Sequence, residues 1–250
     1  GQLHKGGPGG GLFVQLVARR YADLPIPGQG FGFATLARAQ AESQKLNAIF
    51  DEYFEEYLQQ NPILATSIGD PRYNDRFVVG ISPAAMAAEE KLHRDYLARL
   101  QTVDRAVLPT ADQLSYDIFK TGREREIEGF KFPDELIPLN QFYSTPNSFA
   151  QLGSGNGMQP FKTVQDYDNF LKRIDGFVAW TDQAIVNMRE GMAKGVVQPR
   201  PVMEKVLPQL DAMIVTEPAD SAYFAPVKRF PEGIAATDRE RLTSEYTAAI

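Results

Sequence analysis

The feature of the sequence that most constrains its fold is the helical spacing of its apolar residues, which begins near residue 44. Between residues 46 and 58 they recur at i, i+3, i+4 and i+7, and carboxylates occupy the opposite face. This arrangement is typical of an amphipathic helix of about four turns. We expect the helix to end at Asn61-Pro62, because proline lacks an amide hydrogen and restricts the residue before it. The apolar positions are Leu46, Ile49, Phe50, Tyr53, Phe54, Tyr57 and Leu58, and the acidic positions are Asp51, Glu52, Glu55 and Glu56.

Three further helices are indicated by residues that favour a helix start. Ser82-Pro83 combines an N-cap serine with a first-turn proline and should open a helix that runs to about Thr102. Thr110 to Gln113 and Thr237 to Glu240 each fit a capping box, in which a threonine and a residue three positions later exchange hydrogen bonds. The buried stripe of the first of these helices is expected at Met86, Leu92, Tyr96 and Leu100.

The longest predicted helix opens at Thr163 and ends at Gly195, a residue that suits a left-handed C-cap. Its buried side is expected to contain Tyr167, Phe170, Leu171, Ile174, Phe177, Val178, Ala184, Ile185, Met188 and Met192. Pro201 begins another helix, in which Pro208 should kink or shorten the run from 202 to 215. No strand pattern of any length competes with these helices, and no repeat of fixed period appears. The sequence therefore predicts an all-α fold, an irregular array of many helices.

Two regions differ in composition. Residues 1–43 are punctuated by glycine and proline, from the glycine-rich Gly1 to Gly11 to the segment Pro25 to Gly32, and we expect a flexible leader there. Residues 44–250 should form one helical domain. Its last helix reaches Ile250 without a stop signal, so we expect the domain to be truncated within that helix.

Charge and composition exclude several classes of function. Lys and Arg number 26 against 32 Asp and Glu, and the resulting charge of -6 repels nucleic-acid phosphates, so we expect no nucleic-acid partner. The absence of cysteine removes disulfides, thiolate metal sites and cysteine nucleophiles. No stretch approaches the roughly 20 apolar residues that cross a bilayer, so we expect no transmembrane segment. The apolar run Leu12 to Ala18 is followed by Arg19-Arg20, the reverse of the charge order in a signal peptide.

A complete catalytic or metal site is not predicted. The two histidines are His4 in the leader and His93 on the second helix. Glu90 and His93 form a Glu-x-x-His pair, but a di-iron site in a helical bundle needs a second such pair, so we interpret His93 as a structural or surface residue. Gly153 to Gly157 lacks the residues of a nucleophile elbow or a phosphate loop. We therefore assign no catalytic residue and no metal ligand.

The segment from 130 to 160 is rich in proline, glycine and aromatic residues, and an irregular segment of this length is often functional. Two interpretations remain open. Its aromatics can pin a loop onto the helices, or they can line a ligand groove together with neighbouring amides. For the second interpretation the candidate substrate-binding residues are Asn140, Gln141, Tyr143 and Asn147, which lie close to Phe142 and Phe149.

Three long segments resemble a known family. They are NPILATSIGDPRYNDR (Asn61 to Arg76), LIPLNQFYSTPNSFAQLGSGNGMQPFKTVQDYDNFLKRI (Leu136 to Ile174) and GMAKGVVQPRPVMEKVLPQL (Gly191 to Leu210). In this order they resemble the bacterial domain-of-unknown-function family numbered eight hundred and eighty-five, and the likeness extends from about residue 44 to the end. None of the three segments contains catalytic chemistry.

The resemblance implies a zincin-like protein, because members of the family look like zinc metallopeptidases of the gluzincin type. Full-length members are much longer and have a His-Glu-x-x-His helix in their second half, which this sequence lacks. The resemblance therefore implies zinc in the full-length protein, a missing C-terminal half as the partner of this chain, and a peptide substrate. Many members are described as exported lipoproteins, which favours the bacterial periplasm or cell envelope, although this chain has no cysteine to carry a lipid anchor.

Two functional hypotheses follow. In the first, the chain is the N-terminal helical half of a zinc-dependent peptidase, forms a wall or lid of the substrate cleft, and is inactive alone. The segment Asn140 to Gly157 would then contribute to the cleft. In the second, the chain is a non-catalytic helical module that binds a peptide or a protein. Continuation of the reading frame past Ile250 into a His-Glu-x-x-His helix distinguishes them.

Overall fold

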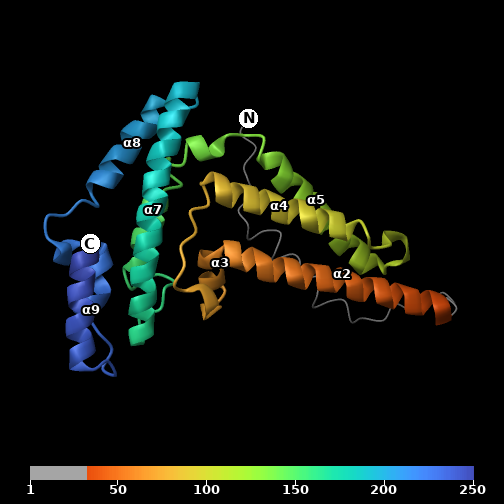
Figure 1. The fold of residues 1–250 in the computed structure, drawn as a ribbon, viewed down its shortest axis with the longest axis horizontal. Helices are drawn as coiled ribbons and strands as arrows, with labels where there is room; N and C mark the ends of the chain where they lie inside the picture. The colour runs from red at the N-terminus through yellow and green to blue at the C-terminus, as the bar shows by residue number, and fades with distance from the viewer. Residues whose placement is uncertain (1–32) are drawn as a thin grey trace. The chain divides into compact units, whose positions relative to one another are not determined.

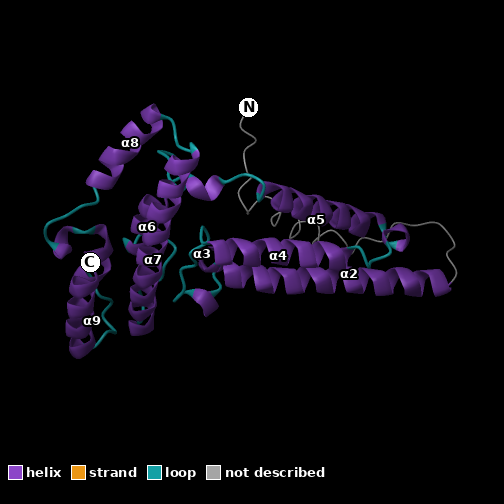
Figure 2. Cartoon of the chain, turned by 45° about the horizontal axis from the view of Figure 1, so that its top comes forward, coloured by secondary structure: helices purple, strands orange, loops and turns teal. Residues whose placement is uncertain are grey.

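The computed structural model describes residues 33–250, and this range contains helices and their connections but no strand (Figure 2). The predicted all-α fold is therefore confirmed. The chain divides into two compact units, each discontinuous in sequence. The described part of unit 1 comprises residues 33–57 and 87–132, and unit 2 comprises residues 58–86 and 133–250. The single helical domain expected over 44–250 stays a prediction.

Unit 1 is built from α2 (Phe33–Gln60), α4 (Pro83–Leu100) and α5 (Thr110–Gly129), although the last residues of α2 and the first of α4 belong to unit 2. Aromatic rings hold the three helices together: the Tyr53 ring meets Tyr96 and Phe119 edge-on, at centroid distances of 5.3 and 5.1 Å. The Tyr96 hydroxyl donates to Glu56 at 2.7 Å, and Arg99 pairs with Glu52, so polar contacts border the aromatic core.

The first helix of unit 1 is longer than the sequence analysis predicted. It begins at Phe33, so residues 33–43, which were assigned to the flexible leader, are helical, and the remainder of that leader lies outside the described residues. This stretch contains no glycine or proline and is rich in strong helix formers. Polar contacts anchor it: Arg38 pairs with Asp104 at 2.6 Å, and the Glu42 carboxylate accepts from the Asp104 amide at 2.8 Å. The spacing of apolar residues does not indicate such polar contacts, so it did not predict this part of the helix.

Unit 2 is organised along α7 (Val164–Lys194), the longest helix among the described residues. The first half of α7 is packed by α9 (Ala236–Ala249) (Figure 1). In α6 (Thr145–Gly153), the Phe149 ring stacks on Phe170 and Phe177 of α7. Phe170 of α7 and Leu242 and Tyr246 of α9 are completely buried in the core between them. The Tyr246 hydroxyl donates to the Tyr167 carbonyl at 3.1 Å. The remaining helices of the unit are α3 (Pro62–Ser67) and α8 (Arg200–Asp211).

Short 3-10 turns connect these helices. In chain order they are η1 (Pro71–Tyr73), η2 (Arg105–Val107), η3 (Asp134–Leu136), η4 (Pro218–Asp220) and η5 (Ala222–Lys228). Between residues 33 and 250 no helix has the length and apolarity required to span a membrane.

Helix ends confirm some of the predicted caps and correct others. Thr163 forms the predicted capping box with Asp166, and Gly195 adopts the left-handed conformation with φ of 72°. The capping boxes predicted at Thr110 and Thr237 are wrong. The Pro109 carbonyl already accepts from Gln113, and the Ala235 carbonyl from Arg239, so both threonines lie inside their helices and their side chains cap nothing. The helix that contains Pro208 continues three residues past it and ends before Val215.

The buried side predicted for α7 is partly wrong. Val178, Ile185 and Met192 are 53%, 40% and 64% exposed, whereas Arg173 and Asn187 are buried. The predicted stripe of α4 is confirmed at Leu92, Tyr96 and Leu100, while Met86 is half-buried. The differences on α7 arise because its neighbours cover it with polar backbone as well as with apolar side chains.

Candidate functional site

A buried arginine fixes the chain around the candidate site in unit 2. Arg173 of α7 is inaccessible to solvent, and its guanidinium hydrogen-bonds to neutral groups. Its Nη2 donates to the Thr66 hydroxyl at 2.6 Å and to the Tyr73 carbonyl at 3.1 Å, and its Nε donates to the Arg76 carbonyl at 3.1 Å. Its Nη1 donates to the Gln159 side chain. Arg173 thereby ties α3, the segment after α3 and the segment after α6 to α7.

Burial lowers the pKa of Arg173 to about 10, an effect that the nearby Asp75 carboxylate partly opposes. The side chain is still charged at neutral pH, because this pKa remains well above 7. A buried cation is tolerated only when hydrogen bonds replace its hydration. The carbonyl, hydroxyl and amide oxygens around Arg173 meet that requirement, so we interpret Arg173 as the structural support of the site.

Phe77, the residue after Arg76, passes very close to α7. A Cβ atom at Gly176 would lie 2.8 Å from the carbonyl oxygen of Phe77, so only glycine allows this approach. The Phe77 ring is held edge-on by Phe149 and Phe177, at centroid distances of 5.2 and 5.9 Å. Aromatic contacts on two sides therefore define the position of Phe77.

The opposite side of the site is α6, which begins with Ser144 as its N-cap and Pro146 in its first turn. Phe149 of α6 stacks on Phe177 of α7 with ring centroids 4.3 Å apart. After α6 the chain turns back so tightly that a Cβ atom at Gly157 would lie 2.6 Å from the Gln151 carbonyl. Met158 follows directly, and its side chain is 55% exposed.

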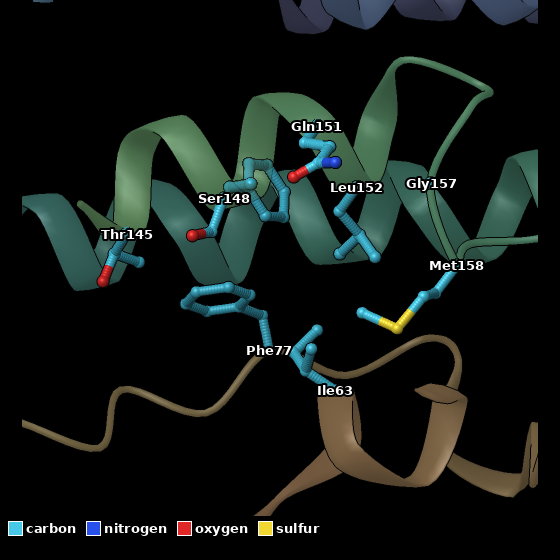
Figure 3. A pocket seen from close by; sticks show the side chains of 9 residues that line it. Ile63, Phe77, Thr145, Ser148, Gln151, Leu152, Gly157 and Met158 are labelled. Carbon is cyan, nitrogen blue, oxygen red and sulfur yellow. The ribbon is translucent and has the colours of Figure 1, made fainter. Parts of the chain in front are cut away.

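These elements enclose an open pocket of about 560 Å³, which we call the α6 pocket. Figure 3 shows Leu152 pointing down from α6 towards Ile63 and Met158, with the Phe77 ring beside them and Thr145 and Ser148 towards the other end of the helix. No lining residue is ionisable, so the pocket can bind and orient a ligand but supplies no acid or base. It is lined by Ile63, Phe77, Thr145, Ser148, Phe149, Gln151, Leu152, Gly157 and Met158.

The four candidate residues chosen from the sequence lie beside α6 but do not line this pocket. The Asn140 side chain accepts from the backbone amides of Phe142 and Tyr143, both at 2.8 Å. Asn147 donates to Gln209 of α8 at 3.2 Å, and Gln209 donates to the Gln141 carbonyl at 3.3 Å. Asn140, Gln141 and Asn147 thus shape the turn and connect it to α8, and substrate binding by these residues and Tyr143 stays a prediction.

The anchoring interpretation of the 130–160 segment is confirmed for Phe149, which is 2% exposed, whereas Phe142 and Tyr143 are 80% and 64% exposed. The ligand-groove interpretation stays a prediction. The segment is also more regular than expected, because it contains α6. A signal for this helix was present, since Ser144 followed by Pro146 resembles the start recognised at Ser82-Pro83.

Ionisable residues do not assemble a metal centre in the described range. Residues 33–250 contain no group of three His, Cys, Asp or Glu side chains able to hold a metal ion, so the zinc implied by the family resemblance does not fit them. His93 lies in the core of unit 1 at 1% exposure, and its Nε2 is 3.9 Å from Glu89. Glu90 pairs with Arg94 at 2.5 Å. His4 lies outside the described residues.

The helices of the described residues and the α6 pocket define an all-α protein with a ligand-sized pocket. The family described as a bacterial protein of unknown function (DUF885) matches residues 62–250, and the chain belongs to this family. The match includes all residues of the α6 pocket. No curated protein matches the chain.

Proposed function

We propose that this chain is the helical, substrate-binding part of a zinc-dependent peptidase and that it forms a wall of the substrate cleft. The observation that carries the proposal is the α6 pocket, which lies within the family match and has the size of a ligand site. The metallopeptidase character comes from the resemblance of the family to gluzincins. In this proposal the zinc ligands lie outside residues 33–250, because the described side chains do not fit a metal.

The composition of the pocket supports a peptide as ligand. Its apolar side chains can accept a side chain, while the hydroxyls of Thr145 and Ser148 and the amide of Gln151 can hydrogen-bond to a neighbouring peptide group. The role of the chain is then to bind and orient the peptide and to exclude water from it.

Binding to the 250-residue chain tests this proposal. We expect a mixture of short fluorescein-labelled peptides to bind saturably, as measured by fluorescence polarisation. Ser148→Trp should abolish the binding because the indole occupies the pocket. Ser244→Trp is the matched control, since Ser244 is an exposed serine on α9 of the same unit, and it should bind like the parent chain. Equal loss in both variants, or no binding to the parent chain, contradicts the proposal.

The alternative function is a non-catalytic module that binds a protein. Exposed apolar residues near α8 favour it, among them Leu207 at 55% and Ile214 at 77% exposure. The reading frame discriminates between the two functions: a peptidase requires that it continue past Ile250 into a His-Glu-x-x-His helix. An in-frame stop codon directly after Ile250 favours the alternative.

A further inference from the structure

We infer that the α6 pocket is a specificity site for a large apolar side chain, with Met158 as its adaptable wall. This inference rests on the proposed peptide-binding function and adds the class of residue that the peptide must present. The apolar lining residues are Ile63, Phe77, Phe149, Leu152 and Met158, and the polar ones carry no charge.

The lining discriminates against charged residues for a physical reason. An ionised side chain in the pocket would lose hydration and find no counter-ion among the lining residues. A leucine, methionine or phenylalanine side chain would instead remove apolar surface from water on both partners. The pocket therefore favours large apolar side chains over acidic or basic ones.

Most of the pocket is preformed. Phe149 and Leu152 are 2% and 5% exposed, and Phe77 is held by two aromatic contacts and by its close approach to Gly176. A site that does not reorganise loses less free energy on binding and discriminates more sharply between shapes. The preformed wall of Phe77, Phe149 and Leu152 therefore gives a bulky side chain a defined place to bind.

Met158 is the exception, because its backbone is anchored while its side chain is not. The preceding Gly157 is pressed against the Gln151 carbonyl, and the following Gln159 receives a hydrogen bond from the buried Arg173. The unbranched thioether between them is largely exposed and faces Ile63 (Figure 3). Methionine adapts its shape to different partners, so one fixed position can cover leucine, methionine and phenylalanine.

Thr145 and Ser148 lie one turn apart on α6 at the end of the pocket away from Met158 (Figure 3). Their hydroxyls both donate and accept, which suits the N–H and C=O of a peptide group beside the bound side chain. The apolar end thus selects the side chain, and the hydroxyl end binds the backbone that carries it.

The test uses the full 250-residue chain and labelled peptides that differ at one central position, which is Leu, Phe, Ala, Asp or Lys. We expect the Leu and Phe peptides to bind roughly tenfold or more tightly than the Asp and Lys peptides, because burial of one aliphatic side chain corresponds to at least that factor. Met158→Glu should weaken the Leu peptide and strengthen the Lys peptide, a reversal that misfolding cannot produce.

Met192→Glu is the matched control, because Met192 is 64% exposed on α7 and does not line the pocket. It should leave the order of peptide affinities unchanged.

A second measurement is the NMR spectrum of the chain labelled with ¹³C-methyl methionine. The Met158 signal should shift on addition of the Leu peptide, and the Met192 signal should not. Equal affinities across the peptide series, or a stationary Met158 signal, overturn this inference while peptide binding by the chain stands. If none of the peptides binds, the proposed function itself is overturned.

Discussion

Arg173 shows how one residue organises a large part of unit 2. Its guanidinium hydrogen-bonds to oxygens of α3, of the segment after α3 and of Gln159. The Thr66 hydroxyl that it contacts donates onward to Asn74 at 2.7 Å. Thr66 and Asn74 are themselves buried. Because these acceptors are also buried, Arg173 and the acceptors each rely on the other for the hydrogen bonds that replace their lost hydration.

We predict that Arg173→Met lowers the free energy of unfolding by about 3 kcal/mol or more, because it leaves the buried oxygens of Thr66 and Gln159 without their donor. Urea unfolding followed by the fluorescence of Trp180, the single tryptophan, measures the change in unit 2. Lys172→Met is the control: Lys172 is exposed and lies 3.7 Å from Asp75, so its loss should change the free energy by less than about 1 kcal/mol. Similar effects of the two substitutions would contradict this role of Arg173.

The sequence did not predict the role of Arg173. Lys172 and Arg173 are adjacent cations on one helix, and the helical period alone assigned the buried positions of α7 to apolar residues. What distinguishes them is a set of oxygens from residues 97 to 111 positions earlier. No local pattern reports contacts over such a separation. Met158 was missed for a similar reason, because Ile63 and Phe77 face it only in the folded chain.

At the scale of elements, glycines set how closely the segments of unit 2 approach one another. Gly176 admits the backbone of Phe77, and Gly153 lies where a Cβ atom would overlap the Phe170 ring. In the sequence Gly176 looks like an ordinary weak point of a helix, and Gly153 lies in the segment predicted to be irregular. In the structure they fix the spacing of the walls of the α6 pocket.

Gly176→Ala should therefore destabilise unit 2 by about 1–3 kcal/mol and weaken binding of the Leu peptide, because the added methyl group displaces Phe77. Gly122→Ala in α5 serves as control, since a Cβ atom at Gly122 would meet no other atom within 4 Å. That control should be neutral or stabilise by up to about 1 kcal/mol. Urea unfolding and fluorescence polarisation measure the two effects, and unchanged peptide binding by Gly176→Ala would show that the spacing does not matter for the ligand.

Sequence patterns located most elements but not all of their ends. Periodicity identified the long helices, and Thr163 and Gly195 marked both ends of α7 correctly. The start at Phe33 was missed because that stretch is held by an ion pair and a hydrogen bond, which apolar spacing does not indicate. The helix α6 was missed because glycine and proline around it masked a nine-residue helix. The predicted capping boxes at Thr110 and Thr237 failed because a cap depends on backbone angles as well as on residue type.

Across the whole molecule, both units contain buried tyrosines whose pKa values are raised. Burial raises the pKa of Tyr57 in unit 1 to about 12, with further increases from the charges of Glu89 and Glu126. Burial alone raises the pKa of Tyr223 in unit 2 to about 12. The unfolded chain ionises these tyrosines near their ordinary value of 10, before the folded chain does.

The stability contributed by these tyrosines is therefore complete below pH 10 and is lost as the pH rises from 10 through 12. We predict a falling free energy of unfolding over this window, measured by urea unfolding at successive pH values. Tyr223→Phe should reduce the slope, and at about pH 8 it should not destabilise the chain, because the Tyr223 hydroxyl is buried without a hydrogen-bond partner among the described residues. An unchanged slope in Tyr223→Phe would contradict this assignment.

The two-unit organisation was the least predictable feature of the molecule. Residues 87–132 pack with α2 rather than with their neighbours on either side, so each unit combines two separate stretches of chain. Helical periods are local and carry no information about which helices pair. The family match over 62–250 includes residues of both units.

The distant oxygens that bind Arg173 have a consequence for how the protein is made. The carbonyls of Pro62, Tyr73 and Arg76 leave the ribosome about a hundred residues ahead of their donor, which corresponds to about 5–20 s of translation. Residues 87–132 emerge in that interval and find α2 already synthesised, so unit 1 can assemble first. The acceptors in residues 58–86 lack their donor throughout that interval, so the hydrogen bonds to Arg173 can form only after unit 1 is synthesised.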